Sequence, residues 1–246
     1  MSARRILATS GGFIAGPVQR SVRVGKMLLD ALAPTGATRP RVCLLETASG
    51  DDASTYARIY EAFHAAGCDV SSRMLFPQPS ANPEERLLSS DLVWVGGGSV
   101  ANLLALWRPH GVDTTMRAAW EQGVILGGVS AGSLCWHVGG TTDSFGPTLR
   151  PVANALGFLP YANGVHYDSE FQRRPLLQSL VANGTLPEVA YASDDHVGIW
   201  YEGTDATRVV ADMSYPAFIG PATYVVTREG NGVVERRVGV GVGENF

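Results

Sequence analysis

The chain has 246 residues, of which 45% are hydrophobic and 17% are charged, and its formal net charge is −4. This length suffices for one large α/β domain with a sizeable core, while the negative charge argues against a nucleic-acid partner, which would require a clustered basic excess. The three cysteines form no CxxC pair, so neither a disulfide scaffold nor a zinc cluster is expected, and the sequence suits a cytoplasmic protein.

Strand-like and helix-like segments alternate along the first half of the chain. The apolar runs that predict strands cover residues 5–9, 42–46, 70–75, 92–95 and 124–127. The patterns that predict helices cover residues 20–33 and 53–66 and begin again near residues 100, 112 and 131. Such alternation is typical of βαβ units, so the sequence predicts an α/β fold with a doubly wound, mostly parallel sheet. The apolar stretch 92–107 is interrupted by glycines and polar residues, so we expect no membrane span.

The pattern changes after about residue 185. Short β-rich segments at 197–201, 208–211, 224–227 and 233–238 are separated by Gly or Asp turns. They predict an antiparallel C-terminal extension of the same sheet, and we expect residues 1–246 to form a single domain.

A glycine run, Gly96-Gly97-Gly98-Ser99, lies directly after a predicted strand and before a helix. Glycines there let a ligand approach backbone N–H groups, and a helix N-terminus favours negative charge. The run also fits a dinucleotide-binding fingerprint, but that motif belongs in the first βα turn and needs an acid after the next strand. We therefore interpret the run as an anion or oxyanion site, with a simple tight turn as the alternative.

A second motif, Gly128-Val129-Ser130-Ala131-Gly132, has the form GxSxG between an apolar strand and a helix. A sharp strand–turn–helix connection forces its serine into a strained conformation that only small neighbours tolerate, and it exposes the hydroxyl above the sheet. The motif therefore predicts Ser130 as a nucleophile, with the N–H of Ala131 directed at a developing oxyanion.

A serine nucleophile needs a base, and His166 in NGVHYDSE is the preferred candidate among the five histidines. His137 lies about two turns beyond Ser130 on the same helix, too far to reach it. His196 is held in reserve, and His166 could also be an ordinary loop histidine. Spacing leaves the orienting acid open among several residues, because triads are recognised by geometry: Asp143, Asp168, Glu170, Asp194 and Asp195.

Arg173 and Arg174 follow the histidine loop at the start of a predicted helix. A guanidinium can bind a substrate carboxylate through two parallel hydrogen bonds. The alternative interpretation is a solvated helix face.

The segments VWVGGGSVANLLALW, GGVSAGSLCW, TTDSFGP and GVHYD together resemble the peptidase E family of serine dipeptidases, which is related to the cyanophycin-degrading enzymes. The resemblance implies a fold like that of class I glutamine amidotransferases, of the flavodoxin-like type, and cleavage after an N-terminal aspartate in short peptides. By motif it implies Ser130 as nucleophile, His166 as base, Gly98 and Ala131 as oxyanion donors, and Asp143 as the acid. Here Ser99, expected to contact substrate, replaces the family's Asn after the glycine triplet.

We therefore expect a serine exopeptidase or dipeptidase acting on small peptides as a monomer or homodimer, with no metal or organic cofactor. One alternative is an α/β-hydrolase esterase, although such enzymes usually place the histidine late in the chain and no histidine follows His196. The other alternative is a catalytically silent module that binds small molecules on the same scaffold.

Overall fold

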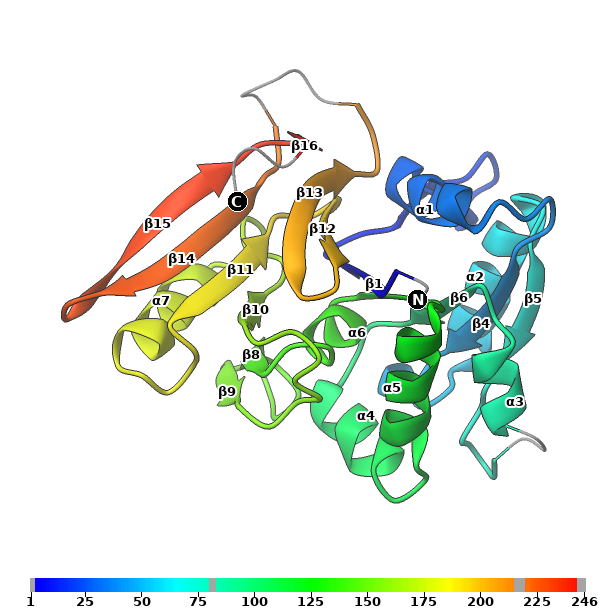
Figure 1. Cartoon of the computed structure of the whole chain (residues 1–246), viewed down its shortest axis with the longest axis horizontal. Coiled ribbons are helices and arrows are strands. Elements are labelled where there is room, and N and C mark those ends of the chain that lie inside the picture. Colours follow the sequence, from blue (N-terminus) through cyan, green and yellow to red (C-terminus); the bar gives the residue numbers. More distant parts are fainter. Residues whose placement is uncertain (1–2, 80–82, 215–219, 243–246) are drawn as a thin grey trace.

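The computed structural model (Figure 1) describes residues 3–79, 83–214 and 220–242. Within these residues the larger sheet has eight strands in the order β16-β13-β12-β1-β7-β6-β4-β5. The parallel block consists of β1 (Arg5–Thr9), β7 (Ile125–Val129), β6 (Leu92–Val95), β4 (Arg41–Leu45) and β5 (Asp69–Ser72). The mixed α/β fold with a mostly parallel central sheet that the sequence predicts is confirmed.

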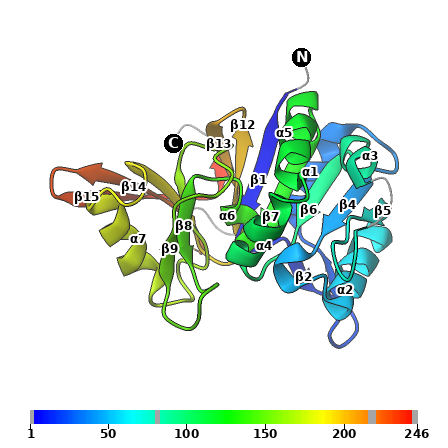
Figure 2. The same cartoon turned by 90° about the horizontal axis from the view of Figure 1, so that it is seen from below.

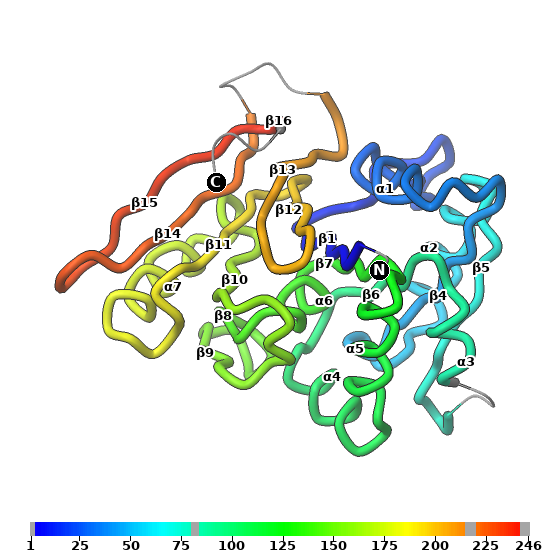
Figure 3. Tube along the Cα trace, in the orientation of Figure 1, coloured from blue at the N-terminus to red at the C-terminus, as the bar shows by residue number. Residues whose placement is uncertain are grey.

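Three later strands extend this sheet beyond β1 with antiparallel pairing: β12 (Val197–Glu202), β13 (Asp205–Ala211) and β16 (Gly241–Val242). The first strand of the chain therefore lies inside the sheet, between β7 and β12, as the tube in Figure 3 makes clear. A strand buried on both sides must be apolar on both faces, and Ile6, Leu7 and Ala8 are all buried.

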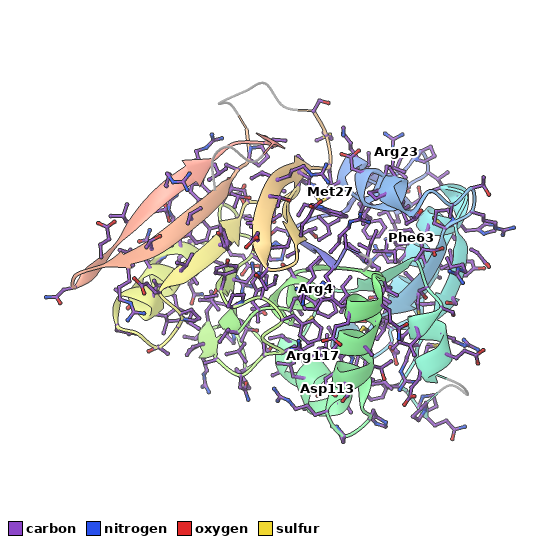
Figure 4. All side chains as sticks on the ribbon, viewed as in Figure 1. Arg4, Arg23, Met27, Phe63, Asp113 and Arg117 are labelled. Carbon is purple, nitrogen blue, oxygen red and sulfur yellow. The ribbon has the colours of Figure 1, made fainter. Side chains whose placement is uncertain are left out.

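Helices cover both faces of the larger sheet (Figures 1 and 2). On one face, α1 (Lys26–Leu32) and α2 (Ala53–Ala65) pack against Leu7, Leu44 and Trp94. Met27 and Phe63, labelled in Figure 4, belong to this layer. The other face is covered by α3 (Pro83–Leu88), α4 (Val100–Trp107), α5 (Val112–Gln122) and α6 (Ala131–Leu134). No helix in the described part of the chain is both long and apolar enough to cross a membrane.

A second sheet lies beside the first, in the order β15-β14-β11-β10-β8-β9. Its strands are β8 (Gly139–Thr142), β9 (Arg150–Val152), β10 (Ala162–Gly164), β11 (Val189–Ser193), β14 (Thr223–Glu229) and β15 (Gly232–Val238). Helix α7 (Arg173–Ala182) packs on one of its faces through Leu177 and Val181. On the other face, Tyr191 packs edge-to-face against Tyr201 of β12, with ring centroids 6.0 Å apart. This contact joins the two sheets.

The prediction that every C-terminal strand extends one sheet is therefore wrong for β14 and β15, because β14 pairs with β11 and β15 pairs with β14. Period-two alternation shows that a segment is a strand but carries no information about which edge it joins. Strands β8 to β10 were missed because they are short and contain glycine or proline.

The predicted helix over residues 20–33 is also wrong in its first part. Val22–Val24 (β3) pairs with Phe13–Ala15 (β2) in a separate hairpin, and α1 begins only at Lys26, after the extended Gly25. β-Branched valines favour a strand, which accounts for the shift. Two short 3₁₀ turns, Ala33–Thr35 and Thr47–Ser49, and helix α3 were not predicted.

The turn after β7 depends on a close approach between backbones. A Cβ added at Gly132, on α6, would lie 2.2 Å from the carbonyl oxygen of Val95, and one added at Gly128 would lie 2.3 Å from the carbonyl oxygen of Gly132. Backbone atoms cannot yield as a flexible side chain can, so both positions require glycine.

We expect Gly132→Ala to lower the free energy of unfolding by about 2–4 kcal/mol, because α6 must move away from β6. Urea unfolding monitored by circular dichroism measures this. The matched control is Gly232→Ala on β15, where the closest atom to an added Cβ, the Glu229 carbonyl oxygen, is 4.0 Å away. Equal stability of the two variants would contradict the packing argument.

Candidate active site

Ser130 occupies a strained turn between β7 and α6. Its backbone has φ 57° and ψ −112°, a region that a non-glycine residue adopts only when its surroundings enforce it. Its N–H donates to the Thr9 carbonyl oxygen at 3.0 Å, and its own carbonyl accepts from the N–H groups of Ser133 and Leu134. The conformation is thus fixed by β1 on one side and by the first turn of α6 on the other.

The glycine triplet lies beside Ser130, where β6 ends. Gly96 donates its N–H to the Leu45 carbonyl, and Ser99 donates to the Ala48 carbonyl, both at 2.9 Å. A Cβ added at Gly97 would be 3.4 Å from the Ser130 Cβ. Among the described residues, no hydrogen bond engages the N–H groups of Gly97, Gly98 or Ala131. The site therefore offers unpaired backbone donors next to the serine.

His166 follows β10 in the second sheet, also with a left-handed backbone (φ 53°). Its N–H donates to the Ser10 hydroxyl at 3.1 Å, which ties the histidine loop to the chain just beyond β1. Its Nδ1 lies 2.6 Å from Asp195 Oδ1. A carboxylate at Nδ1 fixes the imidazole with its Nε2 available, the arrangement that a general base requires.

Asp195 lies in the loop between β11 and β12, and its N–H donates to Asp168 Oδ1 at 2.9 Å. Thus Asp195, one of the carboxylates left open by spacing, contacts the histidine. Asp143, the acid implied by the resemblance, does not: its Oδ1 lies 3.9 Å from Arg173 Nη2 instead. The reason is topological, because β10 and β11 are adjacent and parallel and therefore end at the same edge.

A cavity of about 300 Å³ brings together seven residues singled out in the sequence and Ser144, which was not. The seven are Gly98, Ser99, Ser130, Asp143, His166, Glu170 and Arg173. The hydroxyl of Ser99 accepts the N–H of Asn102 and so caps α4. Arg174 is not in the cavity lining: its guanidinium binds Glu235 and lies over the rings of Tyr167 and Tyr224.

The other two histidines that the sequence analysis weighed are bound elsewhere, and His137 lies beyond the end of α6 and not on that helix as expected. His137 is buried, with Nδ1 3.0 Å from the Ser133 carbonyl and Nε2 3.3 Å from the Tyr201 hydroxyl, and burial lowers its pKa to about 4. His196 faces Asp212 at 3.3 Å. The contact of Ser10 with the histidine loop escaped the sequence analysis, because no motif marks that serine. Asp195 was one of the five open acid candidates, and the parallel pairing of β10 and β11 would have singled it out.

The family model described as peptidase family S51 matches residues 6–209. The chain belongs to peptidase family S51. The uncharacterized peptidase YgaJ of Bacillus subtilis is 39% identical over 213 residues, which cover 86% of this chain and 89% of YgaJ. Peptidase E of Shewanella denitrificans is 27% identical over 161 residues, which cover 62% of this chain and 67% of that protein. The resemblance to peptidase E is confirmed, and the protein is a peptidase.

Two solved structures share the fold of this S51 peptidase. A putative peptidase E from Listeria monocytogenes superposes with a TM-score of 0.59 at 17% identity, covering 87% of this chain and all of that one. A peptidase from an acI-B1 actinobacterium gives a TM-score of 0.61 at 13% identity, covering 97% of this chain and 95% of its own. At these identities the likeness concerns the fold alone.

A buried carboxyl group that the sequence analysis did not single out lies directly beneath the glycine triplet of the S51 site. Glu46 is 3% exposed, and within the described residues neither of its side-chain oxygens has a hydrogen-bond partner. A Cβ added at Gly96 would lie 1.9 Å from Glu46 Oε2, so this carboxyl packs directly beneath the glycine triplet. Burial, followed by the charge of Asp51, raises the pKa of Glu46 to about 7.

The raised pKa makes the stability of the protein depend on pH. The unfolded chain ionises Glu46 near pH 4.5, whereas the folded protein holds the proton up to about pH 7. Glu46 therefore reduces the free energy of unfolding progressively as the pH rises through that window, by on the order of 3 kcal/mol in total.

We expect Glu46→Gln, which keeps the shape and removes the titration, to gain stability relative to wild type between pH 5 and pH 8. Urea unfolding at a series of pH values measures the difference. Glu121→Gln, an exposed position on α5, serves as the control and should follow the wild-type slope. Parallel pH profiles for wild type and Glu46→Gln would show that Glu46 does not titrate in this way.

Proposed function

We propose that this S51 protein is a serine exopeptidase that hydrolyses short peptides through Ser130, His166 and Asp195. One observation carries the proposal: a serine held at a strained turn shares a cavity with a histidine whose Nδ1 is bound by a carboxylate. This arrangement has the roles of a Ser-His-acid triad, and such triads are identified by geometry rather than by chain order.

In the proposed reaction, Ser130 Oγ attacks the scissile carbonyl carbon while His166 Nε2 accepts its proton. The Asp195 carboxylate stabilises the imidazolium that forms. The N–H groups of Gly98 and Ala131 donate to the developing oxyanion, a contribution of about 3–4 kcal/mol per donor. The imidazolium then protonates the leaving amine, and water attacks the acyl-enzyme with His166 again as base.

The fold and the family support the details of the proposal. A parallel block with the serine turn after its inner strand β7 is compatible with the class I glutamine amidotransferase-like arrangement. Membership of a peptidase family favours peptide bonds over the esterase and silent-module alternatives. The small cavity suits a short peptide. An N-terminal aspartate is not favoured as the first residue, because Arg173 and Arg174 are both engaged by other residues of the protein.

We expect Ser130→Ala to reduce kcat for dipeptide hydrolysis by at least about 10⁴-fold, since Ser130 forms the acyl-enzyme in the proposed reaction. The melting temperature should be unchanged or slightly raised. Mass spectrometry after treatment with a phosphonate or sulfonyl reagent should show one adduct on wild type and none on the variant. An adduct on the variant, or retention of more than a few per cent of kcat, would refute the assignment.

We expect Asp195→Asn to lower kcat by roughly 10²–10⁴-fold while leaving KM within a few-fold, because an amide can hold His166 in the wrong tautomer. Steady-state kinetics with one dipeptide substrate measures kcat and KM separately. Asp113→Asn on α5 is the matched control and should behave as wild type. A loss confined to KM would assign Asp195 to substrate binding instead.

A further inference from the structure

We propose that the cavity binds a cationic group of the peptide's first residue, an ammonium or guanidinium, on the carboxylates of Asp143 and Glu170. This inference rests on the proposed function in that it takes the cavity as the place where the peptide lies. It predicts a preference opposite to that implied by the peptidase E resemblance, since an N-terminal aspartate side chain would meet like charge.

Among the described residues that line the cavity, Arg173 is the one arginine, and its guanidinium is engaged by the protein. Arg173 is 3% exposed at its side chain, and its Nε donates to Glu170 Oε2 at 2.8 Å. Its Nη1 donates to the Thr141 carbonyl oxygen at 2.6 Å. Its Nη2 lies 3.9 Å from Asp143 Oδ1. Because Nε, Nη1 and Nη2 all lie beside acceptors of the protein, the guanidinium does not present an open fork to a substrate carboxylate.

The two carboxylates are both ion-paired with Arg173, but they are far more exposed than its guanidinium. The side chains of Asp143 and Glu170 are 59% and 42% exposed, against 3% for Arg173. Two carboxylates against one guanidinium give this wall a net negative charge. Partly buried charges of one sign attract a ligand of the opposite sign and repel one of the same sign.

The same two carboxylates also line an adjoining pocket of about 320 Å³, together with Pro147, Leu149, Ser169, Phe171 and Gln172. Its apolar members can hold the methylene stem of a lysine or arginine while the carboxylates bind the charged end. Phe171, 87% exposed, adds an aromatic face on which a cation can stack. A compact aspartate side chain would use neither feature.

Three other basic side chains do not reverse this charge balance. Arg150, at the start of β9, has its guanidinium 5.9 Å from the centroid of the Phe145 ring and is not among the residues that line either pocket. Arg174 binds Glu235 and lies over the rings of Tyr167 and Tyr224, outside the cavity lining. His166 is held by Asp195, so protonation of its ring would be balanced by that carboxylate. Among the described residues of the cavity, none offers an unengaged cation to an acidic side chain.

The test compares Lys-Ala, norleucine-Ala and Asp-Ala in two assays. Turnover is measured with wild type, and binding is measured by calorimetry with Ser130→Ala, which cannot consume the peptide. We expect Lys-Ala to exceed Asp-Ala by at least about tenfold in both assays, and the ratio to fall as ionic strength increases. Asp143→Asn and Glu170→Gln should each lower this ratio roughly fivefold, while Glu121→Gln should leave it unchanged.

Two arms separate the possible sources of the positive charge. If the carboxylates bind the side chain, Lys-Ala should exceed norleucine-Ala by about tenfold. If they bind the α-ammonium group, these two peptides should be equal and N-acetylation should abolish binding to Ser130→Ala. Either result supports the inference.

Binding or turnover of Asp-Ala equal to or better than that of Lys-Ala would overturn the inference, as would a Lys/Asp ratio unaffected by both carboxylate variants. A failure to bind any of the peptides would overturn it as well. If Ser130→Ala favours Lys-Ala but wild type hydrolyses nothing, the proposed function fails and the inference stands. If wild type hydrolyses Asp-Ala preferentially, the inference fails and the proposed function stands.

Discussion

The close packing of α6 against β6 is the constraint on which the site depends. Gly128 and Gly132 allow the helix to begin immediately after β7, so the chain must reverse at Ser130 within one residue. The left-handed backbone at Ser130 is the consequence, and it is tolerated because Thr9 and the first turn of α6 bind both sides of the peptide unit. The glycines thus determine the direction of the serine, although neither reaches the cavity.

The candidate triad draws on both sheets, which makes the junction between them part of the site. Ser130 follows β7 in the larger sheet, whereas His166 and Asp195 follow β10 and β11 in the smaller one. Ser10 bridges the two: its hydroxyl accepts the N–H of His166 and donates to the Ser193 carbonyl. The packing of Tyr191 on Tyr201 fixes the same junction from the core. A small rotation of one sheet would separate the serine from the histidine.

Charge is distributed around the site in two layers with different consequences. Beneath the glycine triplet, Glu46 is buried and has no hydrogen-bond partner among the described residues. Its neutral carboxyl group is therefore more stable there than the carboxylate up to about pH 7. Around the opening, the side chains of Asp143 and Glu170 are exposed and pair with Arg173. The buried carboxyl group therefore bears on the stability of the segment that carries the glycine triplet, and the exposed carboxylates are the groups to which we assign the proposed choice of substrate.

The sequence alone determined those features that consecutive residues encode. The strand–glycine–helix patterns around Gly96–Ser99 and Gly128–Gly132 were sufficient to predict a parallel α/β sheet and a serine turn, because both depend on local backbone conformation. Only the tertiary structure decided which acid meets His166, since Asp195 lies 29 positions away and reaches it through the parallel pairing of β10 and β11. It likewise decided that Arg173 turns inward to Glu170 and that β14 and β15 form part of a second sheet. The partner of a strand depends on which sheet edges are free when the chain folds. The residue pattern of a single segment does not encode this information.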